Sequence, residues 1–531
     1  MKFPVILRTW HDALPGLAGW RADIAMLLVG ALGALALPPV HLVPVMALCF
    51  PILMRMIDAA PDWRVAARRG FMFGLGMHTA GLYWLTDAIM LRADAFWWLV
   101  PLASPGCALI LTPTTAIPAA LSRLVPAGMA RGLVLAATWT LADMMRVFIF
   151  SGFPWNPPGS IWEFPGRAGD VMIQPAAWIG VDGLTLLTMV LALAPLWGRR
   201  GWMAIAATLL LWAGVGTARL SFPARQGHDA RPNPVVVLVQ GNVPEAEKMA
   251  GNEDVAIFRR YLALTHDGVG QALSQGTQGT QGTQGTQGRP VVFAWPESAF
   301  PGLLLEDAIA RRMIMQAGRG AVAGVIGTLR QDEQDRWRNS MAVLLPPDGQ
   351  VGGVYDKSHL VPFGEYQPAL LPFHVVPGDG MAAGGGVRTW HVPGIAPVGP
   401  LICYEVIFSG QTVDAHDRPA WLLNSTNDGW YGDSAGPRQH LAAVRMRAVE
   451  EGLPVARAAN TGISAIFDGY GHEVARLGWD RTGVIVRAMP DALSPPFFAR
   501  WGRTVPVLLA FGLLGAGLVA GWRNRAAPGR S

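Results

Sequence analysis

The sequence predicts a protein in two parts, an α-helical multi-span membrane domain and an α/β domain that lies in water. Hydrophobic residues make up 51% of the 531 residues and charged residues only 15%, against about 25% in soluble domains. Residues 1–220 contain 25 of the 79 charged residues. Long apolar runs fill this first part, whereas short β-branched runs alternate with helical stretches from Pro234 onward. We therefore predict a membrane domain over 1–220, an α/β domain over 221–500, and a last span with its tail over 501–531.

The membrane domain is predicted from apolar runs long enough to cross a bilayer, which takes about 20 residues. Several runs contain Gly or Pro, which membrane helices tolerate. A cleaved signal peptide is the alternative for residues 1–36, because ALGALAL is similar to a cleavage region, but the spans that follow favour a retained helix. About eight spans are expected: 22–39, 41–57, 70–90, 96–121, 130–150, 172–197, 201–218 and 504–522.

The arginines predict the orientation, because cytoplasmic loops are enriched in basic residues. Basic residues gather before the first span, in every second loop after it, and after the eighth span. Both termini are therefore expected in the cytoplasm, with the α/β domain on the opposite face. The loop 151–166 should share that face, where Trp155 is either an interface anchor or part of a lipid entry. Asp87, Asp143 and Asp182 lie in or near spans and are interpreted as helix-packing or span-end residues.

The α/β domain is predicted from short apolar runs that end in Gly, Pro, Asn or Asp, with helical stretches between them. The insert 275–288 repeats QGT without an apolar side chain, so we expect a flexible loop there. The expected strands are 235–240, 291–296, 321–329, 340–347, 398–408 and 421–427, and the expected helices 253–274, 305–318 and 437–451.

The composition argues against several classes of function. The net charge of +5 comes with no dense basic run, so no nucleic acid is expected as a partner. Cys49, Cys107 and Cys403 have no framework spacing, which argues against disulfides and a cysteine zinc site. Because HExxH and CxxC are absent as well, we expect no metal and no cofactor.

Three ionisable side chains follow or interrupt apolar runs. Glu297 follows a predicted strand in FAWPES, and Cys403 lies near the end of another in LICYEV, two residues before Glu405. Lys357, one of only three lysines, lies in YDKSHLVPFGEYQP, eight residues before Glu365. Taken singly, they read as a helix cap, a buried small hydrophobe and a solvated lysine. Together they supply a base, a nucleophile and a cation for an oxyanion, which is a complete set for acyl transfer.

Four motifs, in this order, resemble the nitrilase superfamily: WPES, DKxHLVPFGEYxP, LICYE and NDGWYGDSAGPxQH. With the flanking spans, GFPW (152–155) and VQGN (239–242), nearly the whole chain resembles the apolipoprotein N-acyltransferases of bacterial envelopes. The resemblance implies a nitrilase-like αββα sandwich on an eight-span base in the bacterial inner membrane. The catalytic domain would face the periplasm.

The resemblance also implies roles for individual residues. Glu297 would be the general base, Lys357 the oxyanion stabiliser and Cys403 the nucleophile. Glu365 would position Lys357 or assist proton transfer. Two residues beside the nucleophile would support the site: Tyr404 and Glu405.

Enzymes of this family take an acyl chain from a phospholipid, typically phosphatidylethanolamine, as a cysteine thioester. They pass it to the α-amino group of the S-diacylglyceryl cysteine at a lipoprotein N-terminus.

Many members carry a tryptophan shortly after VQGN, where this chain has Met249. Asn427 and Trp430 in STNDGWYGD either join the rim of the site or form a turn. The candidate substrate-binding residues are therefore Trp155, Met249, Asn427 and Trp430.

Two other functions are weighed against acyl transfer. A membrane-tethered amidase would use the same three residues with water as the acceptor, but small soluble amides require no multi-span base. A transporter with a binding domain is disfavoured by the complete catalytic set and by the lack of obvious repeat symmetry among the spans.

Overall fold

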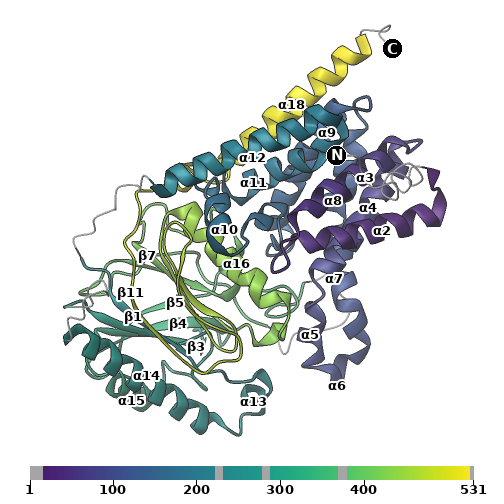
Figure 1. The fold of residues 1–531 in the computed structure, drawn as a ribbon. Helices are drawn as coiled ribbons and strands as arrows, with labels where there is room; N and C mark the ends of the chain where they lie inside the picture. Colours follow the sequence, from purple (N-terminus) through teal and green to yellow (C-terminus); the bar gives the residue numbers. More distant parts are fainter. Residues whose placement is uncertain (1–15, 222–230, 278–287, 369–379, 527–531) are drawn as a thin grey trace. The chain divides into compact units, whose positions relative to one another are not determined.

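The computed structural model describes residues 16–221, 231–277, 288–368 and 380–526. The chain divides into two compact units (Figure 1). The first comprises Met1–Ile149, Phe153–Phe222 and Trp501–Ser531, and the second Phe150–Gly152 and Pro223–Arg500.

Among its described residues, the first unit contains α-helices and 3-10 helices joined by loops, and no strand. Four of its segments are both long and apolar enough to cross a membrane: Gly19–Ala36, Ala93–Ser122, Ala176–Ser221 and Thr504–Arg525. The helices are α2 (Gly19–Gly33), α3 (Met46–Asp58), α4 (Trp63–Gly81), α5 (Leu85–Met90), α6 (Ala93–Phe96), α7 (Ala103–Leu111), α8 (Pro113–Ser122), α9 (Met129–Met144), α10 (Gly166–Ile173), α11 (Ala176–Leu193), α12 (Gly198–Ser221) and α18 (Thr504–Ala526), with 3-10 turns between several of them.

Among the described residues, four segments are long and apolar enough to cross a membrane, fewer than the eight spans that the sequence predicts. Each of the eight predicted runs overlaps a helix, but several helices are short. With a rise of about 1.5 Å per residue, the 16 residues of α9 cover about 24 Å, less than the hydrocarbon thickness of about 30 Å. Four helical segments thus establish the membrane character, and eight spans stay a prediction.

Glycines let α2 and α4 approach each other closely. A Cβ atom added to Gly30 would lie 1.9 Å from the Phe73 carbonyl oxygen, and one added to Gly76 would lie 1.9 Å from that of Leu27. Small residues at such crossings are typical of membrane helix pairs. Two of the acidic residues predicted in or near spans make ion pairs: Asp143 with Arg146 at 2.6 Å and Asp182 with Arg503 at 2.9 Å.

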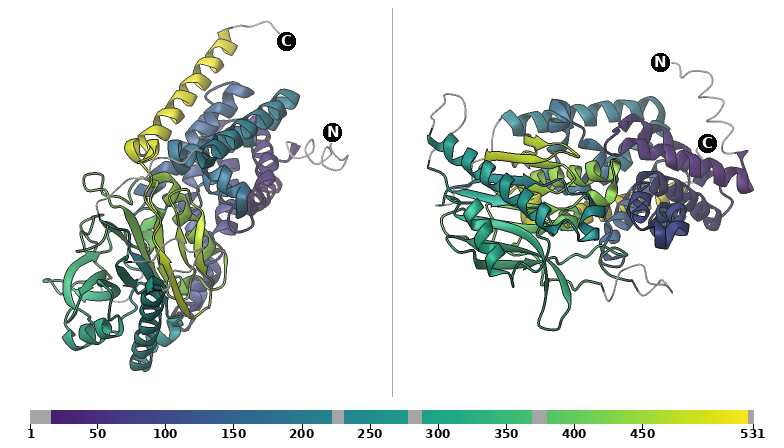
Figure 2. Two further views of the ribbon diagram at one scale, coloured as in Figure 1. Left: turned by 60° about the vertical axis from the view of Figure 1, so that its left-hand side comes forward. Right: turned by 90° about the horizontal axis from the view of Figure 1, so that it is seen from below.

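The second unit is a sandwich of two mixed β-sheets, seen from further directions in Figure 2. The six-stranded sheet has the order β11 (Gly483–Ala488), β1 (Val235–Gln240), β2 (Val291–Ala294), β3 (Ala323–Gln331), β4 (Trp337–Leu345), β5 (Gln350–Asp356). The five-stranded sheet has the order β10 (Glu473–Leu477), β9 (Ser464–Phe467), β8 (Val455–Ala459), β7 (Trp421–Thr426), β6 (Val398–Ile402). Strands β1–β3 are parallel to one another, as are β6–β8.

Alternate side chains of β1 explain the layers of this unit. Val236 and Leu238 point to the core between the sheets, where they join Ile402 of β6. Val237 points outward and packs under Tyr261 of α14 (Asp254–Thr277) and under α15 (Ala308–Ala317). The other sheet is covered by α16 (Ala435–Glu451), which contacts β8. The result is the αββα arrangement that the sequence motifs implied.

Several predicted boundaries differ from the structure by a few residues, and two of the differences bear on the site and on the insert. The strand expected over 398–408 stops at Ile402, because the chain turns at Cys403 into a 3-10 helix, Cys403–Ile407. The helix expected to end at 274 continues to Thr277 and so includes the start of the QGT insert. Residues 278–287 of that insert lie outside the described residues.

Candidate active site

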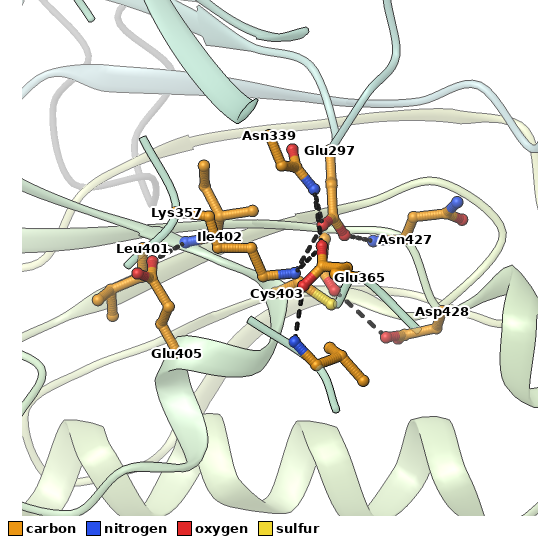
Figure 3. A network of polar contacts seen from close by, with 12 residues as sticks. Glu297, Asn339, Lys357, Glu365, Leu401, Ile402, Cys403, Glu405, Asn427 and Asp428 are labelled. Carbon is orange, nitrogen blue, oxygen red and sulfur yellow. Dashed lines mark hydrogen bonds and ion pairs between the residues drawn. The ribbon is translucent and has the colours of Figure 1, made fainter. Parts of the chain in front are cut away.

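The residues predicted to be catalytic come together at the ends of strands from both sheets (Figure 3). The six-stranded sheet supplies Glu297, three residues past β2, and Lys357, directly after β5. The five-stranded sheet supplies Cys403, directly after β6, and Asn427, directly after β7. All four residues are more than nine-tenths buried.

The Lys357 ammonium lies between two carboxylates. Its Nζ donates to Glu297 Oε1 at 3.1 Å and to Glu365 Oε1 at 2.7 Å. Burial alone lowers the pKa of Lys357, but the charges of Glu297 and Glu365 outweigh burial, and the pKa is raised well above its ordinary value. The lysine therefore stays an ammonium ion although its side chain is only 1% exposed.

Asn339 is a site residue that the sequence reasoning missed. It lies on β4, and its Nδ2 donates to the same two oxygens, Glu297 Oε1 at 2.6 Å and Glu365 Oε1 at 3.2 Å. One amide and one ammonium thus bridge both carboxylates. Asn339 directly precedes the predicted strand 340–347, so the available signal was an amide side chain at the start of that apolar run.

The remaining carboxylate oxygens are bound by the backbone. Glu297 Oε2 accepts from the Asn427 N–H at 2.9 Å, and Glu365 Oε2 accepts from the Val361 N–H at 2.8 Å. Both carboxylates are therefore fixed at each oxygen, so their direction does not depend on the lysine alone.

Cys403 sits on a sharp turn. Its φ angle is +48°, in the left-handed region that a side chain seldom adopts and that often marks functional sites. Burial raises the pKa of the Cys403 thiol far above its ordinary value, the Glu297 carboxylate raises it further, and the Lys357 ammonium offsets only part of the rise. The resting sulfur is thus a neutral thiol, which needs a base before it can attack.

Glu405 joins the cysteine turn to the lysine loop. Its Oε2 accepts from the Ile402 N–H at 2.6 Å. Its Oε1 accepts from the Tyr355 hydroxyl at 2.7 Å, the Ser358 N–H at 2.7 Å and the Ser358 hydroxyl at 2.6 Å. The buried Glu405 carboxylate therefore binds the residue that precedes Cys403. It also binds residues on either side of Lys357, so it links the two sheets at the site.

Tyr404 is anchored by the short segment Phe150–Gly152. The Tyr404 hydroxyl donates to the Gly152 carbonyl at 2.5 Å, and the Ser151 N–H donates to the Tyr366 hydroxyl at 2.9 Å. Ser151 and Gly152 come from the predicted loop 151–166 and Phe150 from the end of the predicted span 130–150, and the segment packs as part of the second unit. Tyr404 and Glu405 thus both brace the turn that carries Cys403.

The four candidate substrate-binding residues have different positions. The side chain of Asn427 donates to Glu245 Oε2 at 2.6 Å, and Trp430 lies part-exposed in the 3-10 turn Gly429–Tyr431. Trp155 belongs to the first unit, where it is buried against Trp84. The Met249 side chain lies outside what the structure describes, although its backbone belongs to α13 (Glu245–Ala250).

No group of three metal-ligating side chains occurs among the described residues. A buried glutamate, lysine and cysteine at the strand ends of an αββα sandwich define a carbon–nitrogen hydrolase type of domain. Residues 287–494 match the family model described as carbon-nitrogen hydrolase. An amidase from Nesterenkonia covers 53% of this chain and 98% of its own at 18% identity, with a TM-score of 0.35.

The first unit identifies the branch of this class. Residues 29–194 match the N-terminal domain model of apolipoprotein N-acyltransferase. The apolipoprotein N-acyltransferase of Rhodopseudomonas palustris is 34% identical over 521 residues, covering 92% of this chain and 94% of the relative. That of Bradyrhizobium diazoefficiens is 36% identical over 541 residues, covering 96% and 95%. The chain belongs to the apolipoprotein N-acyltransferase family, as the motifs indicated.

Proposed function

We propose that this membrane protein transfers a fatty acyl chain from a phospholipid to the α-amino group of the N-terminal S-diacylglyceryl cysteine of lipoproteins. The family and the names of its relatives support the N-acylation of lipoproteins. We propose further that the acyl group is held as a thioester on Cys403 during the transfer and that phosphatidylethanolamine is the acyl donor. The observation that carries the thioester step is the buried Cys403 thiol beside a carboxylate and an ammonium ion.

In the first half-reaction Glu297 acts as the general base. It takes the thiol proton as Cys403 Sγ attacks the ester carbonyl of the phospholipid, and a C–S bond forms. The negative charge on the carbonyl oxygen is stabilised by the Lys357 ammonium. The intermediate then collapses, the C–O bond breaks, and the lysophospholipid oxygen takes the proton back from Glu297. Cys403 is left as a thioester.

In the second half-reaction the neutral α-amino group of the lipoprotein attacks the thioester carbonyl. A C–N bond forms, Glu297 accepts the amine proton, and Lys357 again faces the oxyanion. The C–S bond breaks, and the sulfur recovers its proton from Glu297. The products are an N-acylated lipoprotein and the free Cys403 thiol.

The two units divide this work. We propose that residues 1–220 and 501–531 form a membrane base of eight spans with both termini in the cytoplasm. Residues 221–500 would form the catalytic domain on the periplasmic side of the bacterial inner membrane. A membrane base suits an enzyme whose donor and acceptor are both lipid-anchored, since it holds the site at the bilayer surface.

The test is peptide-resolved mass spectrometry of the purified, detergent-solubilised protein incubated with phosphatidylethanolamine of one acyl chain. We expect the mass of that acyl chain to be added to the peptide that contains Cys403. A diacylglyceryl-cysteine peptide should remove the acyl group rapidly, and water should remove it slowly. Cys403→Ala should lose both adduct and transfer, whereas Cys107→Ala, in the helical unit, should keep both. Full transfer by Cys403→Ala would refute the nucleophile, and rapid discharge by water would favour an amidase.

A further inference from the structure

A second polar cluster contacts the backbone of Cys403, and its side chains have no role in the two half-reactions described above. It consists of Asp428, two residues past β7, His440 on α16, and Arg457 on β8. Each side chain is 0% exposed. Buried charges are costly unless they are paired and hydrogen-bonded, so a fully buried trio beside a nucleophile calls for an explanation.

The members of the cluster hold one another in place. Arg457 Nη2 lies 2.7 Å from Asp428 Oδ2, and His440 Nδ1 lies 2.9 Å from Asp428 Oδ1. Arg457 Nη1 donates to Asn424 Oδ1 at 2.5 Å. A neutral imidazole carries one proton, so with that proton on Nε2 the unprotonated Nδ1 accepts from Arg457 Nη2 at 3.2 Å, and this contact fixes the ring on its Nδ1 side.

The other ring nitrogen contacts the nucleophile's own backbone. His440 Nε2 lies 3.0 Å from the Cys403 carbonyl oxygen, which requires the proton on Nε2 for a hydrogen bond. Asn424 Nδ2 donates to the same oxygen at 3.4 Å. The carbonyl of a residue with a φ angle of +48° is thus held by two side chains.

This contact bears on reactivity because of the strained backbone. A residue in a sparsely populated conformation persists only where its surroundings fix it. Figure 3 shows the Cys403 sulfur beside the Lys357 ammonium and the Glu297 and Glu365 carboxylates. If the Cys403 peptide rotated toward an unstrained conformation, the sulfur would move away from these groups.

We propose that His440 is a positioning residue for the nucleophile. Supported by Asp428 and Arg457, it holds the Cys403 carbonyl and so keeps the sulfur aimed at Glu297 and Lys357. The inference rests on the proposed function in one respect, that Cys403 is the residue that becomes acylated.

The test compares His440→Leu, His440→Gln and His440→Asn. Gln places an amide N–H near the position of Nε2 and can reach the Cys403 carbonyl, whereas the shorter Asn matches only Nδ1, and Leu donates nothing. The matched control is Glu450→Gln, which weakens another buried pair on α16, Arg447 Nε to Glu450 Oε2 at 2.9 Å. The Glu450 carboxylate also accepts from the Ser409 hydroxyl at 3.0 Å.

Two rate constants are measured per folded molecule: thioester formation from phosphatidylethanolamine, and alkylation of Cys403 by iodoacetamide followed on its own peptide. His440→Leu and His440→Asn should slow thioester formation roughly 10- to 100-fold, as small misplacements of a reacting group do, with little change in KM. Alkylation should slow as well. His440→Gln should recover to within about tenfold of the unaltered protein, and Glu450→Gln should lower the melting temperature but neither rate constant.

Equal rates for the Gln and Asn variants would overturn the inference, and this comparison holds even if the Leu variant does not fold. Rates of His440→Leu within about threefold of the unaltered protein would also overturn it and leave the cluster a purely stabilising role. Acyl transfer by Cys403→Ala would instead overturn the proposed nucleophile. The two failures are therefore distinguishable.

Discussion

The Lys357→Met substitution removes a positive charge that contacts both carboxylates of the site, Glu297 and Glu365. Methionine is flexible and close to lysine in length, so the substitution removes mainly charge and little packing. We expect the variant to bind phospholipid but to form the thioester slowly.

The structure sets the size of the effect. Lys357 Nζ makes contacts of 3.1 and 2.7 Å with Glu297 and Glu365, and its side chain is 1% exposed, so solvent screens these contacts little. Loss of one group that stabilises an oxyanion costs about 10²- to 10³-fold in kcat. Loss of one partner of a buried ion pair also costs about 3–5 kcal/mol of stability. The variant should therefore be both slow and less stable.

The assay is single-turnover thioester formation, quenched and read by mass spectrometry, because it separates the chemical step from binding and product release. The matched control is Arg330→Met. It removes a cation from the neighbouring pair with Asp356, where Arg330 Nη2 lies 2.6 Å from Asp356 Oδ2 and both side chains are partly exposed. We expect the rate of the control to stay within about threefold of the unaltered protein, because the bidentate pair of Arg330 is with Asp356 and not with the Glu297 and Glu365 carboxylates that Lys357 contacts.

A Lys357→Met variant that formed the thioester within about tenfold of the unaltered rate would refute the assignment of Lys357 as the oxyanion stabiliser. A loss of stability with an unchanged rate would show that the lysine only neutralises its two carboxylates.

Two further predictions concern Asn339 and Asp428. Asn339→Leu removes donors at 2.6 and 3.2 Å from Glu297 and Glu365, so kcat for acyl transfer should fall roughly 10- to 100-fold; an unchanged kcat would contradict its role. Burial opposes ionisation of Asp428, but the Arg457 guanidinium outweighs burial and holds the pKa of Asp428 at about 2, below the usual 3.8. The resulting stabilisation, about 2 kcal/mol, is fully present above about pH 4 and is lost as the pH falls toward 2. Asp428→Asn should flatten the decline in melting temperature over that range; an unchanged slope would contradict the linkage.

The strands that the sequence predicted well share a clear pattern. β1 and β7 are continuous apolar runs between turn residues, and they begin at the predicted positions. β5 was not predicted because Gly352 and Gly353 interrupt its apolar pattern. β8 was not predicted because it contains Arg457, which is buried only because Asp428 pairs with it. A tertiary contact between separate elements thus decided what local composition could not.

The same limit applies to the site. Glu297, Lys357, Glu365 and Cys403 were predicted to act together, and the structure places them together; their catalytic roles stay proposals. Asn339 and His440 were not recognised. Asp428 and His440 both lie in the motif NDGWYGDSAGPxQH, but they are twelve residues apart in different elements, and that spacing does not predict their contact. Residues that bond to catalytic groups are set by the fold, and sequence spacing does not identify them.

The division of the site between two sheets has a consequence for when the enzyme becomes reactive during folding. The base and the cation belong to one sheet and the thiol to the other, and Glu405 bonds to both sides only when the sheets have packed. In a chain whose sheets have not met, Cys403 is an ordinary thiol without a neighbouring base. On the proposed mechanism, closure of the sandwich is therefore also the step that brings the base to the thiol, so a half-folded molecule cannot form the thioester.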